Sequence, residues 1–404
     1  MTSTFIHTDL RARLKSFRAG SFDELERFLR LQPDAPRDGR FVALKRAVDA
    51  FQGFARESAP GFDFYTDLLP QLREWALDSG THRPLPLLRS GEPGRVELSE
   101  RQVRHILACA FFLGTISAPS AGTLSLLGVY LAPWQEAVER VLCLLAYFHR
   151  SHDAREVPSV VFSRYRQSPS SRPSWAELDL PVRADSARLH TQDMESSPAP
   201  VFVDFANRDL HIHRIIPSLT QEEVLFSCCP ELFPGILFCE RLLDDEVIVV
   251  EGARRFTTYR GYLSTFRFTG LHPARPAQEV LVVDAVMSGQ FAPSRVLRDL
   301  NKFHLGLASC RGRQVSTGHW GCGAFGGDKT LKFLQQVCAA TAAGGLLDYS
   351  TFRDEDTCAR LGALLSQAEA RGHTVASLVR LACAYEGLRD RPPFARYVTE
   401  GLGG

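Results

Sequence analysis

The chain has 404 residues, of which 45% are hydrophobic and 23% charged, and its 47 basic and 46 acidic residues leave a formal net charge of +1. This composition is typical of a globular protein with two or three domain-sized units. It lacks the basic excess with which a charge-driven binder of nucleic acid or membranes neutralises phosphates. We therefore expect no direct DNA binding and no membrane association.

The N-terminus and the cysteines bear on where the chain resides. Residues 1–17 carry charges where a signal peptide has its apolar stretch, and no segment reaches the roughly 18 apolar residues of a membrane span. The ten cysteines form no C-x-x-C pair and lie mostly in apolar runs, which favours buried thiols in a reducing compartment. We expect a soluble protein of the nucleus, the cytoplasm or both.

The first 150 residues are predicted to be mainly helical. Leu98–Gly114 begins with Ser99, and Gln102 follows three residues later, which is the pattern of a capping box. A second amphipathic run follows Pro133. Its apolar face is predicted to pack on a core, and four side chains lie off that face: Gln135, Glu136, Glu139 and Arg140.

After residue 150, short β-branched runs alternate with helical ones, beyond a polar segment (Arg164–Arg172) that indicates a loop or a domain seam. This alternation predicts an α/β layered domain with a largely buried sheet. The predicted strands are Val201–Phe205, Val247–Val250, Val280–Val283, Val315–Thr317 and Leu346–Phe352; the predicted helices are Gln221–Phe226, Ser294–Leu300, Lys329–Ala343 and Cys358–Ala370.

The segment VDFANRDLHIHRIIPSLTQEEV (203–224) is a candidate for acid–base chemistry. Asp204 falls within an apolar strand, and Glu222 and Glu223 open a short helix. Two adjacent carboxylates can have different environments, and one that keeps its proton can serve as a general acid in glycosidic cleavage. A structural interpretation stands beside this one, because Thr220 and Glu223 also form the T-x-x-E pattern of a capping box.

The segment GHWGCGAFGGDKTLKFL (318–334) is a candidate anion site. Its glycines lie between a predicted strand and a predicted helix, where backbone N–H groups and a helix N-terminus can approach a diphosphate. The segment matches neither the P-loop pattern nor a dinucleotide fingerprint. A tight structural connection is the alternative.

Two further patterns each have a structural alternative. In FTTYRGYLSTFRF (256–268), aromatic and basic residues interleave as they do in sites that stack on a base, and also in ordinary half-buried strand pairs. His211 and His213 would face one way on a strand and could hold a metal, but no third ligand follows at a recognisable spacing. No metal site is predicted.

Taken together, VDFAN, QEE, the Arg-Gly-Tyr run and GCGAFGGD resemble poly(ADP-ribose) glycohydrolase. The similarity covers residues 98 to 390. It implies an α/β fold, a macrodomain-like three-layer α/β/α sandwich with a mixed sheet, preceded by a mainly helical domain. The corresponding domains are residues 1–155 (helical accessory domain), 156–390 (catalytic domain) and 391–404 (a loosely ordered C-terminal tail).

The resemblance also implies the roles of individual residues. The family's acidic trio falls on Asp204, Glu222 and Glu223, with Glu223 as the acid that protonates the departing ribose hydroxyl and Glu222 holding a hydroxyl of the substrate ribose. No cofactor and no metal are implied. The implied substrate-binding residues are Glu195 and Tyr262 on the adenine side, Asn207 and Gln221 at the ribose and diphosphate, His319, and the second diphosphate loop, Gly321, Cys322, Gly323, Ala324, Phe325 and Gly326.

One departure from the family pattern concerns its three consecutive glycines, which here are His211, Ile212 and His213. Side chains at these positions would occupy space that the ligand needs, and β-branched Ile212 resists a positive φ. The run could extend as a strand, or the two imidazoles could contact the diphosphate in place of the lost backbone amides. The family's asparagine before Trp-Gly-Cys-Gly is likewise replaced, by His319.

We therefore expect a monomeric glycosidase that hydrolyses the ribose–ribose O-glycosidic bonds of poly(ADP-ribose), acts on ADP-ribosylated proteins and belongs to the DNA damage response. The alternative is a weakened or inactive macrodomain that binds ADP-ribose or ADP-ribosylated proteins. A third possibility is an interaction protein whose cleft is filled by residues 211–216.

Overall fold

A computed structural model describes residues 2–3, 8–81, 84–115, 120–151, 159–274 and 277–403. The N-terminal part is mainly helical, as predicted, and a π-helical turn, Phe64–Leu68, leads into its fourth helix. A short pair of strands, β1 (Thr2–Ser3) and β2 (Leu85–Pro86), lies beside these helices. The helices are α1 (Thr8–Ser16), α2 (Phe22–Leu29), α3 (Val42–Ser58), α4 (Leu69–Leu77), α5 (Glu100–Phe111), α6 (Leu127–Leu131) and α7 (Gln135–Ser151).

The two helices that the sequence predicts in this part are present. Ser99 caps α5, and the side chain of Gln102 closes the predicted capping box. The polar face predicted for α7 is wrong for Glu139 and Arg140, which are both buried. This helix is covered on two sides because it packs against α3 and α6 and also contacts α8 and β9 of the following part of the chain.

The centre of the molecule is an eight-stranded mixed sheet in the order β3-β4-β7-β10-β6-β11-β12-β5. Strands β10, β6, β11, β12 and β5 form a parallel run, whereas β3 and β4, β4 and β7, and β7 and β10 pair antiparallel. The strands are β3 (Gly94–Leu98), β4 (Val160–Arg166), β5 (Ala187–His190), β6 (Val201–Ala206), β7 (Glu246–Arg254), β10 (Ala277–Asp284), β11 (Val315–Thr317) and β12 (Leu347–Ser350).

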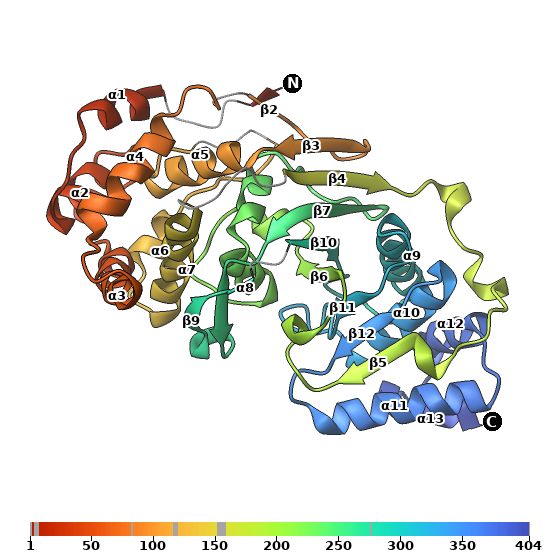
Figure 1. Cartoon of the computed structure of the whole chain (residues 1–404). Helices are drawn as coiled ribbons and strands as arrows, with labels where there is room; N and C mark the ends of the chain where they lie inside the picture. Colours follow the sequence, from red (N-terminus) through yellow and green to blue (C-terminus); the bar gives the residue numbers. More distant parts are fainter. Residues whose placement is uncertain are drawn as a thin grey trace.

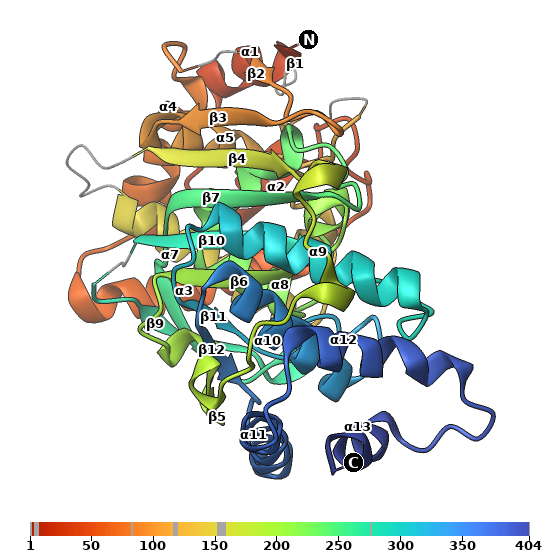
Figure 2. The same cartoon turned by 90° about the vertical axis from the view of Figure 1, so that its right-hand side faces the viewer.

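Both faces of this sheet are covered, which gives the predicted three layers. Alternate residues of β6 divide between two cores: Val201 and Val203 pack toward α9 (Pro293–Ser309) and α10 (Lys329–Ala343), whereas Phe202 packs with the N-terminal helices. The layers lie on opposite sides of the strands in Figures 1 and 2. The remaining helices are α8 (Gln221–Cys228), α11 (Glu355–Ala370), α12 (Val375–Ala384) and α13 (Phe394–Gly403).

Three details differ from the predicted organisation of the chain. Strand β3 lies within the segment predicted to be a helical domain, yet it forms an edge of the central sheet. The predicted loose tail, residues 391–404, contains helix α13, which buries Phe394, Val398 and Leu402 against the second core. Three apolar side chains at helical spacing gave this helix a face to bury. The polar segment 164–172 also begins inside β4, because Arg164 is buried there against Glu246.

The sheet brings the candidate residues to one edge. Strands β6 and β11 are parallel neighbours, so the segments that follow their carboxyl ends, at Asn207 and Gly318, emerge side by side. The aromatic and basic stretch forms an antiparallel hairpin of β8 (Thr257–Arg260) and β9 (Arg267–Leu271) near this edge. No helix in the described ranges is long and apolar enough to cross a membrane.

Candidate active site

Helix α8 is attached to β6 through Gln221. The side-chain oxygen of Gln221 accepts the N–H of Phe205 at 2.8 Å, and its Nε2 donates to the carbonyl of Val203 at 3.0 Å. The side-chain amide of Gln221 therefore forms two hydrogen bonds with the backbone of β6, and these hold the first turn of α8 beside the end of the strand. The two glutamates that follow Gln221 are held at the carboxyl edge of the sheet.

The connection between β6 and α8 has a left-handed backbone at the three positions where the family has glycine. The φ angles of His211, Ile212 and His213 are 52°, 49° and 54°. A left-handed backbone costs a residue with a Cβ about 1–2 kcal/mol. The prediction that this run could extend as a strand is therefore wrong, and with it the premise that both imidazoles face one way.

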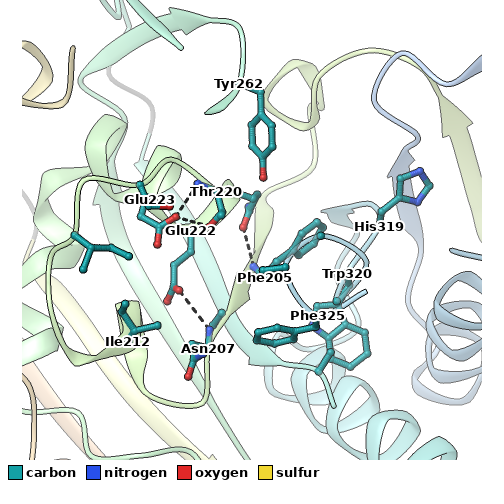
Figure 3. Close-up of a pocket in the computed structure, with 18 residues that line it drawn as sticks. Phe205, Asn207, Ile212, Thr220, Glu222, Glu223, Tyr262, His319, Trp320 and Phe325 are labelled. Carbon is teal, nitrogen blue, oxygen red and sulfur yellow. Dashed lines mark hydrogen bonds between the residues drawn. The ribbon is translucent and has the colours of Figure 1, made fainter. Parts of the chain in front are cut away.

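The three side chains of this turn point in different directions. His211 is fully buried beside Phe226 and Phe233, with ring centroids 4.9 and 5.6 Å away. Nε2 of His213 lies 3.1 Å from the carbonyl oxygen of Cys239, outside the cavity. Only Ile212 lines the cavity (Figure 3). The imidazoles are thus not placed to contact a ligand diphosphate.

The two glutamates of α8 accept hydrogen bonds from different groups. Glu222 Oε1 accepts the N–H of His211 at 2.6 Å, and its Oε2 accepts the N–H of Asn207 at 3.3 Å. Glu223 Oε2 accepts the N–H of Thr220 at 2.7 Å and also its hydroxyl. The capping box predicted as the structural alternative is therefore present, and Glu223 lines the cavity at the same time.

The environment separates the pKa values of these two carboxyl groups. Burial, with the charges of Asp204 and Glu223, raises the pKa of Glu222 well above its ordinary value. Burial also acts to raise the pKa of Glu223, but His211, the hydrogen bonds from Thr220 and the charge of Arg140 together lower it. Within the pair, the environment therefore favours the proton on Glu222 and the charge on Glu223.

Asp204 lies beneath this pair. Its side chain is fully buried in β6, and among the described residues neither carboxyl oxygen has a hydrogen-bond partner. Burial and the charge of Glu223 raise the pKa of Asp204 well above its ordinary value. Asp204 does not line the cavity. Asp204 can therefore raise the pKa of Glu222 through its charge, but it is not placed to contact a ligand in the cavity.

The glycine-rich loop after β11 needs its glycines for steric reasons. Gly321 has a φ of 73°, and a Cβ there would lie 2.6 Å from the Cβ of Ala285. A Cβ on Gly327 would lie 2.6 Å from the carbonyl oxygen of Gly321. In the described part of the chain, the N–H groups of Gly323, Ala324 and Phe325 have no protein acceptor. Such consecutive free amides are typical of an anion site.

Two adjoining cavities of about 240 Å³ each lie between the glutamates and this loop. Figure 3 shows Ile212, Glu222 and Glu223 on one side of the first cavity, with Trp320 and Phe325 on the other. Both cavities share five lining residues and so form one cleft: Phe205, Gln221, Tyr262, His319 and Gly323.

The second cavity has an aromatic rim. Tyr262 and Phe352 lie with ring centroids 5.7 Å apart, and both line this cavity. Glu195 also lines this cavity and accepts the hydroxyl hydrogen of Tyr259 at 2.7 Å. An edge-to-face aromatic pair beside a half-buried carboxylate suits a flat, hydrogen-bonding ring such as a nucleobase.

His319 lines both cavities. Its Nδ1 lies 3.1 Å from the hydroxyl of Tyr349, and among the described residues its Nε2 has no partner. Burial and the charge of Lys329 lower the pKa of His319 to about 4. The ring is therefore neutral at physiological pH.

Comparison with known proteins gives two family matches. Residues 173–359 match the macro domain fold of poly(ADP-ribose) glycohydrolase, and residues 59–164 match the helical domain of the same enzyme. The chain belongs to the poly(ADP-ribose) glycohydrolase family. This confirms the resemblance and the fold class that the sequence predicted.

Curated members of the family are distant relatives. The chain is 25% identical to poly(ADP-ribose) glycohydrolase 1 of Arabidopsis thaliana over 364 residues, which cover 68% of this chain and 66% of the relative. It is 25% identical to poly(ADP-ribose) glycohydrolase 1 of Caenorhabditis elegans, with 71% and 40% covered. The chain thus spans less than two thirds of the length of these relatives.

Solved structures of bacterial family members are similar at lower identity. The Thermomonospora curvata enzyme bound to the inhibitor ADP-HPD is 14% identical, with a TM-score of 0.32 over 58% of this chain and 98% of that one. The Deinococcus radiodurans enzyme in complex with ADP-ribose is 15% identical, with a TM-score of 0.30 over 52% and 93%.

The cleft gathers most of the residues that the family resemblance implied. Asn207, Gln221, Glu222, Glu223, Tyr262, His319, Gly321, Gly323, Ala324 and Phe325 line the first cavity, and Glu195 and Cys322 line the second. Two implied residues lie elsewhere. Asp204 is beneath the cleft, and Gly326 lines a separate cavity beside α13, because the loop turns away from the cleft at its own φ of 64°.

Sequence reasoning missed three residues of the site. Phe352 was expected to end a strand and Lys329 to begin a helix, and both line the second cavity. Arg140 was expected to lie off the apolar face of its helix, but it is buried behind the loop at 211–218. Within the described ranges, no group of three or more His, Cys, Asp or Glu residues is arranged to hold a metal ion.

Proposed function

We propose that this chain hydrolyses the ribose–ribose O-glycosidic bonds of poly(ADP-ribose) and releases ADP-ribose. Family membership supports the proposal, and so does one feature of the cleft: two adjacent carboxyl groups with opposite pKa shifts face a loop with three free backbone amides. A terminal ADP-ribose unit carries a ribose that can bind at the two carboxyl groups and a diphosphate that can bind at the three amides. The aromatic rim at Tyr262 and Phe352 suits its adenine.

The proposed reaction uses the glutamates in turn. Glu223 protonates the departing 2′-oxygen of the neighbouring unit as the bond to the anomeric carbon breaks, and an oxocarbenium-like centre forms. Water then adds to that carbon, and Glu223 takes the proton that the water loses. The anomeric carbon gains the hydroxyl of the water, and the departing 2′-oxygen gains a proton. One water is therefore consumed for each ADP-ribose released.

The proton for the first step is held close to where it is needed. In the free protein Glu223 is the charged member of the pair and Glu222 the protonated one. An anionic diphosphate entering the cleft raises the pKa of the nearby carboxylate. We propose that this charge moves the proton toward Glu223 when substrate binds, while Glu222 holds a ribose hydroxyl.

A local anion site suffices for such a substrate. The free amides of the 323–325 segment contact one diphosphate, so a chain with a net charge of +1 can act on a polyanion one terminal unit at a time. ADP-ribosylated proteins that carry such polymers are the corresponding partners.

The test is incubation of the purified chain with poly(ADP-ribose) and chromatography of the products. We expect free ADP-ribose to accumulate. Polymer of unchanged length and no ADP-ribose, under conditions in which the chain is folded, would contradict the proposal.

A second candidate function is ADP-ribose binding without turnover, and one observation favours it. Ile212 lines the first cavity at a position where the family has glycine, beside both glutamates. Calorimetry with ADP-ribose distinguishes the two functions, because a binding module would bind the nucleotide while leaving the polymer intact.

A further inference from the structure

The turn at residues 211–213 holds a left-handed backbone without glycine, so side chains must hold it there. This turn matters for the glutamates because the N–H of His211 is itself the 2.6 Å donor to Glu222 Oε1. Any displacement of His211 therefore displaces the strongest hydrogen bond to Glu222. The question is which groups hold His211 in place.

The ring of His211 is held by two polar partners as well as by packing. Its Nδ1 lies 2.9 Å from the carbonyl oxygen of Arg214, and its Nε2 lies 3.3 Å from Nη2 of Arg140. A carbonyl only accepts and a guanidinium only donates. Nδ1 therefore carries the hydrogen and Nε2 accepts, which fixes a neutral tautomer.

Arg140 joins this ring to the rest of the loop and to α8. Its Nη1 donates to the carbonyls of Ile216 and of Ser218, the latter at 3.0 Å. Its Nε donates to the hydroxyl of Ser227 at 3.2 Å, and that hydroxyl donates to the carbonyl of Glu223 at 2.7 Å. One buried guanidinium thus contacts both ends of the loop and the helix that carries the glutamates.

We propose that Arg140 and His211 form a positioning pair that fixes Glu222 and Glu223 in the geometry of the reaction. The inference rests on the proposed function for its reaction, and on the contacts above for its geometry. Arg140 comes from α7, so the helical part of the chain takes part in building the active site. The pair uses side chains to hold a left-handed turn at positions where the resemblance places the family's glycines.

A purely structural role for His211 is the competing explanation, because its ring also packs against Phe226 and Phe233. His211→Phe separates the two, since it keeps an aromatic ring in that site and removes both hydrogen bonds. His213→Phe is the matched control. It makes the same change at the same backbone conformation, at a ring that bonds to Cys239 and not to Arg140.

We expect His211→Phe to lower kcat for ADP-ribose release by roughly 10- to 100-fold, with KM within about threefold, because small displacements of catalytic groups have effects of this size. His213→Phe should leave kcat within about twofold. Thermal unfolding of both variants shows that each is folded. Equal kcat values for the two variants would overturn the proposal.

Arg140→Met supplies the second half of the test. If the two residues act through each other, the double variant Arg140→Met/His211→Phe loses no more kcat than the more damaging single variant. Losses that multiply would show independent roles. If Arg140→Met does not fold, Arg140→Lys, which keeps the charge and loses the branched contacts, takes its place in the cycle.

Nitrogen-15 NMR of the histidine rings tests the contact without reference to activity. His211, assigned by its absence in His211→Phe, should carry its proton on Nδ1 at neutral pH, and its Nε2 resonance should shift in Arg140→Met. A proton on Nε2 in the wild-type protein would overturn the pair. Should the wild-type chain release no ADP-ribose, the proposed function fails while this result still decides the contact.

Discussion

The two loops that border the cleft have a similar backbone and different side chains. In the loop after β11, Gly321 and Gly326 have φ angles of 73° and 64°. In the loop after β6, His211, Ile212 and His213 have angles of 52°, 49° and 54°. The first loop has no Cβ at its left-handed positions, and the second has three.

This difference corresponds to two tasks. A Cβ on Gly321 would collide with Ala285 and one on Gly327 with the backbone of the loop itself, and among the described residues the N–H groups of Gly323, Ala324 and Phe325 have no protein acceptor. The other loop directs its one short hydrogen bond to Glu222 and buries its first side chain. A left-handed turn can therefore be kept without glycine where the chain uses it to place a carboxylate, whereas the loop after β11 needs glycine at Gly321, where the left-handed backbone lies close to Ala285.

The largest expected effect concerns the carboxyl group that both loops face. Glu223→Gln removes the acid and keeps the hydrogen-bonding shape, so kcat should fall by about 10²- to 10⁴-fold, the usual contribution of general acid catalysis. ADP-ribose release measured by chromatography gives the rate. Glu177→Gln, at an exposed position, is the control. Equal rates in the two variants would remove Glu223 from the reaction.

The glycine loop is tested by a matched pair of alanines. Gly321→Ala places a Cβ 2.6 Å from Ala285 at a φ of 73°, whereas a Cβ on Gly61, which lines neither cavity, meets nothing within 4 Å. We expect Gly321→Ala to weaken ADP-ribose binding by roughly 10- to 100-fold, the effect of losing one or two hydrogen bonds to a charged group. Gly61→Ala should bind normally. Calorimetry measures both, and equal affinities would contradict an anion role for this loop.

The pH profile tests how the pair of glutamates shares its proton. Glu222 has a raised pKa, so it stays protonated above the range of a free carboxyl, and Glu223, whose pKa is lowered, stays charged below that range. A reaction that needs one proton on the pair should lose kcat/KM as pH rises past the raised pKa of Glu222 and as pH falls past the lowered pKa of Glu223.

Glu222→Gln removes the group that gives the alkaline limb of this profile. We expect the limb to move to lower pH, because Glu223 alone must then hold the proton. The acid limb carries a second titration in both proteins, because burial and Arg140 lower the pKa of His211 to about 4. An alkaline limb at the same pH in wild type and Glu222→Gln would assign it to another group.

Local patterns in the sequence were enough to predict much of this molecule. The capping box at Ser99, the strand around Asp204 and the helix Lys329–Ala343 depend on residues close to one another in the chain, and all three are present. The glycines at 321–327 likewise predicted a tight loop. Such features are specified by short-range geometry, which the sequence shows directly.

What the sequence could not show depends on contacts between distant segments. Arg140 and His211 are 71 positions apart, and nothing local to either indicates that both are buried or that one accepts from the other. The opposite pKa shifts of Glu222 and Glu223 arise from burial and from residues on separate segments of the chain: Asp204, His211, Thr220 and Arg140. Adjacent glutamates suggested different environments, but only the packing decides which one keeps the proton.

The smallest expected effect concerns the side chain that most distinguishes the two loops. Ile212→Gly removes the apolar group from the first cavity and relieves a left-handed backbone, which is worth about 1–2 kcal/mol. The greater entropy of glycine in the unfolded chain offsets about 0.5–1 kcal/mol of that gain. The free energy of unfolding should therefore change by about 1 kcal/mol or less, as urea denaturation would measure.

The activity of this variant decides what Ile212 does. If its side chain crowds the terminal ribose, kcat/KM for polymer should rise severalfold in Ile212→Gly. Ile216→Ala is the control, because Ile216 lines the same cavity without a positive φ, so it tests space alone. A rise in Ile212→Gly only would show that backbone freedom at the family's glycine position limits the reaction. A fall would show that the isoleucine helps to hold the turn, and that side-chain support at Ile212 as well as at His211 replaces glycine in this loop.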